Sequence, residues 1–333
     1  MEFRAPGKIV VWGEYAVLTG APACVFALDC YAQVELEKTQ QGWSLLAQGF
    51  NTPAIHTHNP SFSNVDVARV ANGVLEYLSV QQYPTPFSLT INSKAFYIDG
   101  HKLGLGSSAA VCNCVCAAFN ELLNTSLTYQ DAIKIHRQLQ GGKGSGLDVA
   151  ASWLGGAIQF TNADALPLTW NKNIYWQIIW SGSSSETYKH IASFEQWRTN
   201  TADTSTLDEL SELSHKLCTQ QSLPLLAQYT QALKRFDDAA SLNIFTTQHQ
   251  TLTDIALNQG LVYKPCGAGG GDVGMVFSTS PDFTAFNANA QKIGAIPLNL
   301  SRWEKRTGRS MERAFLGSCR YSVEPVSRSA NRR

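Results

Sequence analysis

The chain has 333 residues, 44% of them hydrophobic and 16% charged, and its net charge at pH 7 is +0. This balance excludes an intrinsically disordered chain, and the lack of a basic excess argues against a nucleic-acid-binding surface. Because chains of this length usually divide, we expect two domains, at residues 1–170 and 171–325, and a basic tail at 326–333.

The cysteines and the first residues indicate the compartment. The chain has 8 cysteines and no CxxC pair, and Cys112, Cys114 and Cys116 alternate along a predicted helix. We expect them to pack inside a reduced, cytoplasmic protein rather than to form disulfides or a metal site. The apolar run at 9–12 is too short for a signal peptide or a membrane span, so we expect no membrane partner.

The first predicted strand covers residues 9–12, where a β-branched run follows the turn-forming pair Pro6-Gly7. Lys8 stands at the start of this strand and Glu14 just past its end. Lys8 is either a surface lysine or a buried one that needs a partner, because an ionised amine beside an apolar strand is costly. Next we expect strands at 24–37 and 43–47, a loop at 51–64 and a helix at 65–79.

Residues 102–110 read K-L-G-L-G-S-S-A-A, between an alternating segment and an apolar run. A strand, a glycine-serine turn and a helix start in this order create an anion site, because the first N–H groups of a helix are unpaired and partly positive. Gly104 and Gly106 let a phosphate approach the backbone, and Ser107 and Ser108 add hydroxyls. The alternative is an ordinary strand-to-helix turn with Ser107 as N-cap.

A second glycine-rich loop follows a helix predicted at 128–139. Residues 140–152 read Q-G-G-K-G-S-G-L-D-V-A-A-S and place one acid, Asp148, at the start of an apolar segment. Asp148 is either a helix N-cap or a catalytic base and partner for a lysine.

A polar segment at 161–173 marks the expected domain boundary, and a third glycine cluster follows at 264–274, K-P-C-G-A-G-G-G-D-V-G. If the three loops converge, their backbone N–H groups line one polyanion site. The other expected elements are strands at 155–160, 174–180 and 295–300, an apolar run at 275–277, and helices from about residue 188, at 207–236 with a break at Pro224, at 246–258 and at 280–294.

Together these segments resemble the three motifs of the GHMP kinase superfamily, named for galactokinase, homoserine kinase, mevalonate kinase and phosphomevalonate kinase. The first motif resembles residues 5–23, A-P-G-K-I-V-V-W-G-E-Y-A-V-L-T-G-A-P-A, the second resembles K-L-G-L-G-S-S-A-A, and the third resembles G-A-G-G-G-D at 267–272. The resemblance spans residues 4 to about 300, and K-L-G-L-G-S-S-A-A and G-K-G-S-G-L-D-V-A-A-S look most like the phosphomevalonate kinase branch. It implies an α+β fold of two domains, one like ribosomal protein S5 domain 2 and one ferredoxin-like, with the active site between them.

The resemblance also implies an ATP- and Mg²⁺-dependent kinase that converts 5-phosphomevalonate to 5-diphosphomevalonate. Asp148 and Lys8 match the family's catalytic aspartate and lysine, and Ser108 matches its Mg²⁺ ligand. The ATP phosphates would lie on Gly104, Leu105, Gly106, Ser107, Ser108, Ala109 and Ala110. The acceptor would contact Lys102, Lys143, Ser145, Ser183, Ser184, Gly267, Ala268, Gly269 and Gly270.

One position departs from the family. Mevalonate kinases usually carry a glutamate ligand for Mg²⁺ about eleven positions before the catalytic aspartate, where this chain has Arg137 beside His136. A cation cannot ligate Mg²⁺, which disfavours mevalonate kinase and leaves the second ligand open. The alternatives are mevalonate kinase or another small-molecule or sugar kinase of the superfamily, and a non-catalytic ligand-binding regulator. In each case we expect a small phosphorylated or carboxylated partner, no nucleic acid, and a monomer or homodimer.

Overall fold

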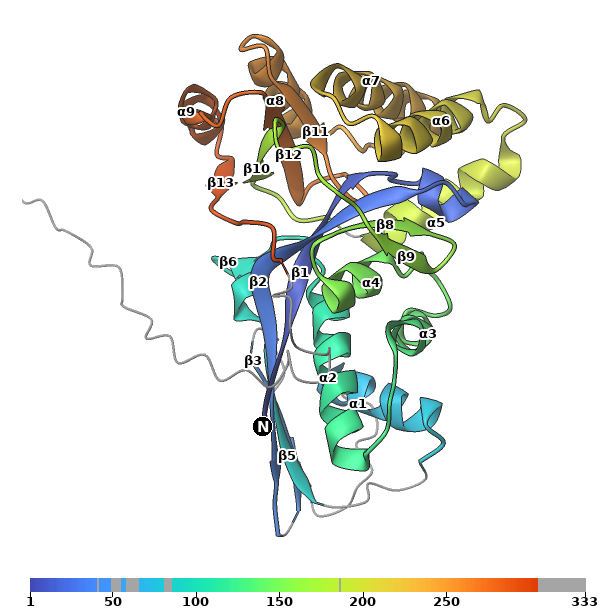
Figure 1. Ribbon diagram of the computed structural model, residues 1–333, viewed down its shortest axis with the longest axis vertical. Helices are drawn as coiled ribbons and strands as arrows, with labels where there is room; N and C mark the ends of the chain where they lie inside the picture. The colour runs from blue at the N-terminus through green and yellow to red at the C-terminus, as the bar shows by residue number, and fades with distance from the viewer. Residues whose placement is uncertain (41, 49–54, 58–65, 81–85, 186, 305–333) are drawn as a thin grey trace, which may run out of the picture.

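The computed structural model describes residues 1–40, 42–48, 55–57, 66–80, 86–185 and 187–304, which form two layered parts, one above the other in Figure 1. The predicted tail at 326–333, the end of the predicted second domain and most of the predicted loop at 51–64 lie outside the described residues. The domain limits at residues 170 and 325 stay predictions. In the described part, no helix is long and apolar enough to cross a membrane.

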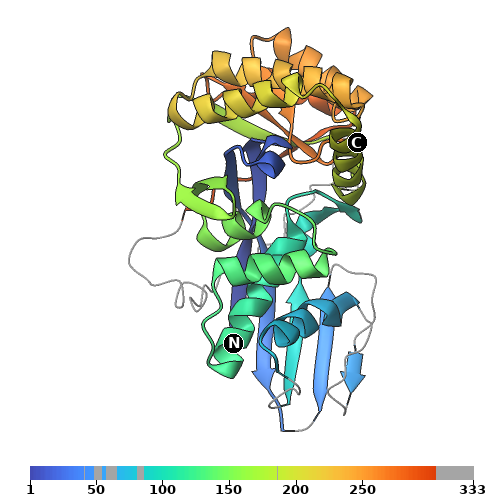
Figure 2. The same ribbon diagram turned by 90° about the vertical axis from the view of Figure 1, so that its right-hand side faces the viewer.

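The first part is a seven-stranded sheet covered on one face by four helices (Figures 1 and 2). Its strands are β1 (Glu2–Trp12), β2 (Ala23–Lys38), β3 (Trp43–Gln48), β4 (Ile55–Thr57), β5 (Phe87–Asn92), β8 (Ala157–Thr161) and β9 (Asp164–Pro167). The helices are α1 (Asp66–Tyr77), α2 (Ser107–Leu123), α3 (Tyr129–Leu139) and α4 (Leu147–Leu154). The strand order is β4-β3-β5-β2-β8-β9 with β1 paired to β2, and a small hairpin, β6 (Tyr97–Ile98) and β7 (His101–Lys102), precedes α2.

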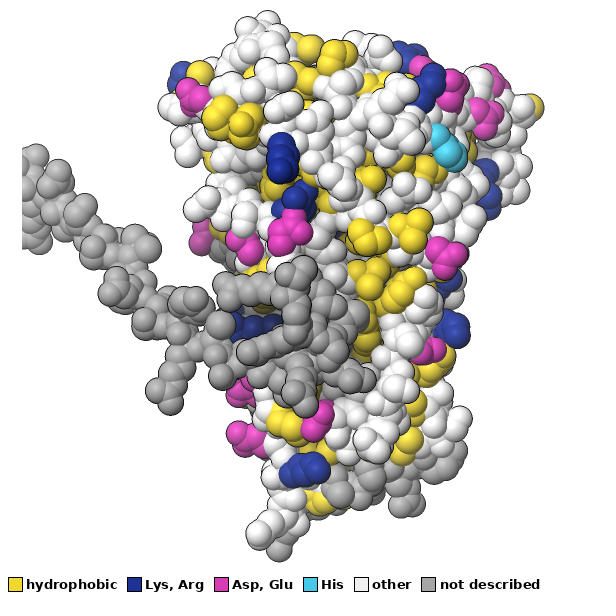
Figure 3. Space-filling view, viewed as in Figure 1, with side chains coloured by type: hydrophobic (Ala, Val, Ile, Leu, Met, Phe, Trp, Pro, Cys, Tyr) yellow, Lys and Arg dark blue, Asp and Glu magenta, His cyan; other side chains and the backbone are white. Residues whose placement is uncertain are grey.

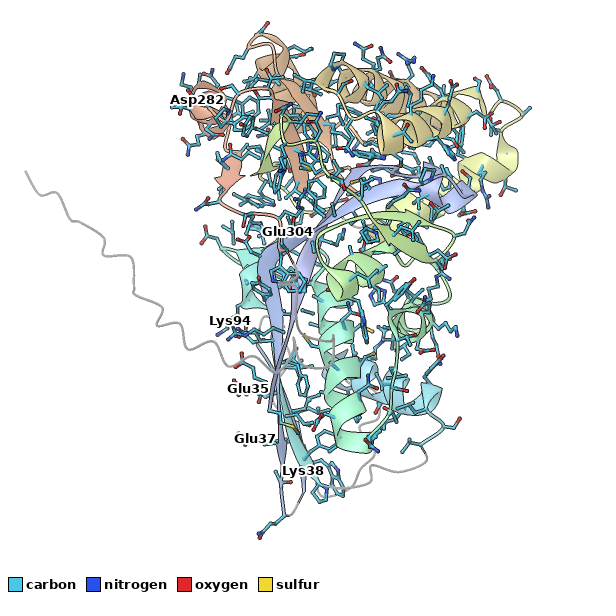
Figure 4. All side chains as sticks on the ribbon, in the orientation of Figure 1. Glu35, Glu37, Lys38, Lys94, Asp282 and Glu304 are labelled. Atoms are coloured by element: carbon cyan, nitrogen blue, oxygen red, sulfur yellow. The ribbon has the colours of Figure 1, made fainter. Side chains whose placement is uncertain are left out.

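The sequence of β2 explains why only one face of this sheet carries helices. Its buried residues Val34 and Leu36 alternate with exposed Glu35 and Glu37, so the apolar side chains share the helix-covered face. Figure 4 shows Glu35 and Glu37 directed away from the helices. Acidic and basic side chains are mixed over the face in Figure 3, in keeping with the net charge of +0.

The second part is a four-stranded antiparallel sheet with the order β11-β12-β10-β13. Its strands are β10 (Tyr175–Trp180), β11 (Val262–Pro265), β12 (Val273–Ser278) and β13 (Ile296–Leu298). The helices are α5 (Thr187–Asn200), α6 (Ser205–Thr219), α7 (Leu223–Ala240), α8 (Thr247–Leu257) and α9 (Thr284–Lys292). Taken in chain order, the strands lie 2-3-1-4 across the sheet and helices separate the first pair and the last pair, which is the ferredoxin-like arrangement expected from the sequence.

Each end of the described chain joins both parts. At the end of β1, Trp12 stacks on Trp170, and beyond it the Tyr15 ring packs against Phe194 and Phe236 of the second part. In the opposite direction, residues 301–304 return to the first sheet, where Trp303 N–H donates to the Ala27 carbonyl. The two parts therefore share one continuous apolar core.

Several local predictions are confirmed. Thr128 caps α3 and exchanges hydrogen bonds with Asp131 in a capping box, as the sequence at 128–131 indicates. The strands expected at 24–37 and 43–47 are β2 and β3, and the helix expected at 65–79 is α1. Cys112, Cys114 and Cys116 are buried and free of disulfides.

Other predictions were wrong. Pro6-Gly7 is a register shift inside β1, not a turn, so the strand begins at Glu2. The helix expected at 280–294 covers only Thr284–Lys292, because Ser280 and Asp282 bind local N–H groups in a turn. The loop at 51–64 contains β4, and Pro224 lies in the first turn of α7, so the helix break precedes it.

Candidate active site

The N-terminus of α2 lies against β1 at Lys8. Lys8 N–H donates to the Leu105 carbonyl at 2.8 Å, which fixes the turn beside the strand. Gly106 has φ +82°, and a Cβ there would lie 2.8 Å from both Cγ and Cε of Lys8, so only glycine fits. Gly106 is the N-cap and no side chain caps the helix, so the interpretation of Ser107 as N-cap was wrong. The first N–H groups of α2 are therefore available to an anion.

Lys8 and Asp148 meet beside this helix end. Lys8 Nζ lies 3.4 Å from Asp148 Oδ1, with the Lys8 side chain 9% exposed and the Asp148 side chain 38% exposed. Lys8 is thus the buried, paired lysine of the two alternatives rather than a surface one. The N-cap of α4 is Gly146, and no side chain caps the helix. Asp148 is therefore not the cap, and its carboxylate is free to face Lys8. A buried cation beside a half-exposed carboxylate suits a site that binds and moves charge.

Ser108 has a histidine partner on α3. Ser108 Oγ and His136 Nε2 lie 3.0 Å apart. Burial lowers the pKa of His136, the nearby charge of Lys102 lowers it further, and Asp148 opposes both. A neutral imidazole beside the hydroxyl follows, and it leaves an oxygen lone pair of Ser108 free for a cation.

Arg137, which stands where the family glutamate is expected, turns away from this group. Its Nε donates to the Gly144 carbonyl at 2.9 Å, and a second guanidinium nitrogen binds the Ser145 carbonyl. Arg137 thus braces the second glycine loop. Ser145 Oγ accepts from Leu147 N–H at 3.3 Å in the first turn of α4. Lys143 is exposed in the same loop and has no hydrogen bond or ion pair within the described chain.

The third glycine loop approaches the first one through Asp272. A Cβ on Gly104 would lie 2.4 Å from the Asp272 carboxyl carbon, so the two loops are in direct contact. Asp272 Oδ1 accepts from Ser185 N–H at 2.9 Å. Burial raises the pKa of Asp272, while the Ser185 N–H and the charges of Lys8 and Lys102 oppose that rise. From the sequence, Asp272 was recognised only as the last residue of the third motif, G-A-G-G-G-D, and no role was predicted for it.

The hydroxyl-rich segment after β10 completes the contact between the two parts. Ser184 Oγ donates to the Lys102 carbonyl at 2.9 Å, and Asp272 N–H donates to the Ser183 carbonyl at 2.7 Å. Lys102 itself is exposed. The predicted residues Lys102, Ser183 and Ser184 therefore lie together beside the third loop.

A buried polar cluster behind the loops was not predicted. Lys264 Nζ and Glu14 Oε1 form an ion pair whose side chains are 0% and 1% exposed. Tyr229 OH donates to Glu14 Oε2 at 2.8 Å and accepts from Gly13 N–H at 2.8 Å. This cluster joins the end of β1 to β11 and α7. The feature of the sequence that could have indicated this cluster is that two charged residues, Glu14 and Lys264, stand next to apolar strands.

The donor set indicates what the site can hold. Groups of three His, Cys, Asp or Glu that would bind a metal by themselves are absent from the described residues. A hydroxyl, Ser108, and a carboxylate, Asp148, offer oxygen donors, which suits Mg²⁺ because that ion keeps several waters and shares its ligands with bound phosphates. The side-chain-free turn at Gly104 and Gly106 suits the phosphates themselves.

Comparison with known proteins identifies the architecture. Residues 67–156 match the family of GHMP kinases N terminal domains. The solved Streptococcus pneumoniae phosphomevalonate kinase, in complex with phosphomevalonate and AMPPNP, superposes with a TM-score of 0.76 over 91% of this chain and 99% of that one, at 20% identity. This chain has the two-domain GHMP kinase fold. The Methanococcus jannaschii mevalonate kinase, a second solved GHMP fold, gives a TM-score of 0.73 at 20% identity over 92% of this chain and 98% of its own.

Curated relatives extend the similarity over most of this chain. The phosphomevalonate kinase of Streptomyces sp. (strain CL190) is 26% identical over 90% of this chain and 96% of its own. That of Saccharolobus solfataricus is 28% identical over 82% and 88%, respectively. The mevalonate kinase of Thermococcus sibiricus is 25% identical over 88% and 93%.

Proposed function

We propose that this protein is an ATP- and Mg²⁺-dependent kinase that phosphorylates a small anionic acceptor, 5-phosphomevalonate, to 5-diphosphomevalonate. The observation that carries the proposal is the Lys8–Asp148 pair, 3.4 Å apart at the uncapped, glycine-lined N-terminus of α2. Relatives named phosphomevalonate kinase that match 82% to 90% of the chain support it.

The chemistry asked of these residues is transfer of the γ-phosphoryl group. An oxygen of the acceptor phosphate attacks the γ-phosphorus, a new P–O bond forms, and the bond to the bridging oxygen breaks so that its electron pair leaves with ADP. Because the attacking phosphate is already ionised, positioning and charge neutralisation matter more than proton removal. Lys8 supplies a positive charge next to the α2 N-terminus, and Asp148 orients Lys8 and the acceptor.

Mg²⁺, when bound with ATP, neutralises phosphate charge in this site. Ser108 and Asp148 are the residues that we assign to hold it, since both present oxygen donors beside the α2 N-terminus. Ser108→Ala should accordingly raise the KM for Mg·ATP without unfolding the protein.

The charges around the acceptor side favour a phosphorylated acceptor. The positive charges of Lys8 and Lys102 both act to lower the pKa of Asp272. Both lysines therefore lie near the contact between the first and third loops. Two cations in one place suit a phosphate better than a neutral hydroxyl acceptor.

Mevalonate kinase activity is the second candidate. The half-exposed Asp148 carboxylate can accept the proton of an alcohol as well as orient a phosphate, and the match to the mevalonate kinase of Thermococcus sibiricus agrees with this. A non-catalytic ligand-binding regulator would have no need of Lys8, Ser108 and Asp148 together.

An ADP-release assay decides among these activities. The acceptors are 5-phosphomevalonate, mevalonate, homoserine and galactose, each with Mg·ATP. We expect the highest kcat/KM on 5-phosphomevalonate. A preference for mevalonate would replace the first proposal by the second candidate, and negligible turnover on every acceptor would remove kinase activity on this set.

A further inference from the structure

The third glycine loop, residues 266–272, is held from outside by three side chains of three different segments. Tyr15 OH donates to the Ala268 carbonyl at 2.6 Å, and Ser185 Oγ donates to the Gly269 carbonyl at 2.7 Å. The third contact, 2.9 Å long, joins His249 Nε2 to the Gly271 carbonyl. The carbonyls of Ala268, Gly269 and Gly271 are therefore turned toward these three side chains.

The N–H groups of the same loop are distributed differently. Gly270 N–H donates to the Ile244 carbonyl at 3.1 Å and Asp272 N–H to the Ser183 carbonyl. For the N–H groups of Gly267 and Ala268, by contrast, no acceptor is found among the described residues. Backbone N–H groups left free by a glycine turn with positive φ form a concave anion receptor.

His249 is a fully buried histidine of α8 that the proposed chemistry does not use. A carbonyl only accepts hydrogen bonds, so His249 Nε2 must carry the proton that binds Gly271. Burial lowers the pKa of His249 to about 4, so at neutral pH Nδ1 carries no proton and accepts from Tyr263 OH, which lies 2.8 Å away. The imidazole is thus neutral, with both ring nitrogens paired and a single possible tautomer.

The peptide that follows the Gly271 carbonyl leads into Asp272. Gly271 has φ +138° and Asp272 has φ +55°, a backbone path that must be held in place. Tyr263 OH is held too, since a Cβ on Gly274 would lie 2.3 Å from it. The direction of one carbonyl thus decides where the Asp272 carboxylate lies against Gly104.

We propose that His249 and Tyr263 are positioning residues for the acceptor site. Through the Gly271 carbonyl they orient the peptide between Gly271 and Asp272, and so keep the loop N–H groups directed at the anionic group of the acceptor. This inference rests on the proposed function only in taking a phosphorylated acceptor as the ligand of the loop.

The test compares two substitutions of His249 with a control on the same helix. His249→Leu removes the donor to Gly271, whereas His249→Gln can present an amide N–H in its place. Leu252→Ala changes another fully buried residue of α8, in the apolar cluster with Ile179 and Val276, and so weakens the core without removing a hydrogen bond to the loop. We expect His249→Leu to lower kcat/KM for 5-phosphomevalonate about tenfold with the KM for ATP unchanged, and His249→Gln to restore most of it.

Amide hydrogen exchange of the loop peptide provides a readout that needs no activity. In His249→Leu, the bonded N–H groups of Gly270 and Asp272 should exchange about tenfold faster than in Leu252→Ala at matched global stability. Equal exchange in the two variants would overturn the inference, whatever the kinetics. If the wild-type protein phosphorylates none of the acceptors, the proposed function fails, and the exchange result still decides the positioning role.

Discussion

Replacing Lys264 by methionine should destabilise the protein strongly, because it leaves a buried carboxylate without its cation. Glu14 and Lys264 have side chains that are 1% and 0% exposed, and among the residues that the structure describes the one other donor to the Glu14 carboxylate is Tyr229 OH. Methionine has nearly the length of the lysine stem, so the change removes charge with little loss of volume.

The size of the effect follows from burial. Removing one partner of a buried ion pair costs about 3–5 kcal/mol, because the remaining charge is neither solvated nor neutralised. Unfolding entropy of about 2.1 cal/mol/K per residue gives roughly 0.7 kcal/mol/K for this chain, so the expected fall in Tm is about 4–7 °C. Removing both charges should be less harmful. Glu14→Gln with Lys264→Met keeps an acceptor for Tyr229 and should recover about 2 kcal/mol of that loss.

The assay is thermal and urea unfolding of the wild-type protein, both single variants and the double variant. Lys216→Met, which breaks the exposed pair with Glu212, is the matched control and should leave the midpoint unchanged. If Lys264→Met shifts the midpoint no more than Lys216→Met does, the pair contributes nothing and the reasoning is refuted. Strict additivity of the two single changes would likewise show that the charges are not coupled.

Three further results are expected. Asp148→Asn should lower kcat by roughly 10²-fold with the KM for ATP nearly unchanged, and wild-type turnover would show that Asp148 is only a first-turn residue of α4. Gly106→Ala should lower kcat/KM by about 10²-fold because the new Cβ displaces Lys8, whereas Gly141→Ala, which has a similar positive φ and open space, should leave it nearly unchanged. Burial lowers the pKa of His249 to about 4, below its unfolded value of 6.5. The stability that the neutral imidazole contributes is therefore fully present above pH 6.5 and is lost as the pH falls toward 4. In urea titrations the free energy of unfolding of the wild-type protein should fall by about 3 kcal/mol over this pH range because of His249, and this fall should be missing in His249→Gln.

The features that the sequence predicted correctly are those with local causes. The capping box at Thr128 and Asp131 needs only four residues, and the alternation of β2 needs only its own strand. The glycine turn before α2 could likewise be located, because a glycine at a helix start carries its own backbone signal. Pro6-Gly7 misled for the same reason, since a bulge and a turn favour the same residues.

The partners of the site residues could not be predicted, because they come from distant segments. Lys264 lies 250 positions from Glu14, and no periodicity or spacing connects the two. Arg137 and His136 are adjacent in the sequence, yet α3 directs His136 to Ser108 and Arg137 to the second glycine loop. Asp272 became visible as a site residue only when its contact with Gly104 was known.

The packing of the β1 end against the second part also sets an order for synthesis of the chain. Trp12 and Tyr15 become buried only against residues made much later, since Tyr15 OH binds the carbonyl of Ala268, 253 positions further on. A ribosome adds about 5–20 residues per second, so roughly 10–50 s pass between the synthesis of Tyr15 and that of Ala268. A chain that stops before residue 170 lacks Trp170, Phe194 and Phe236, the ring partners of Trp12 and Tyr15, so such prematurely terminated products should aggregate through residues 12–17.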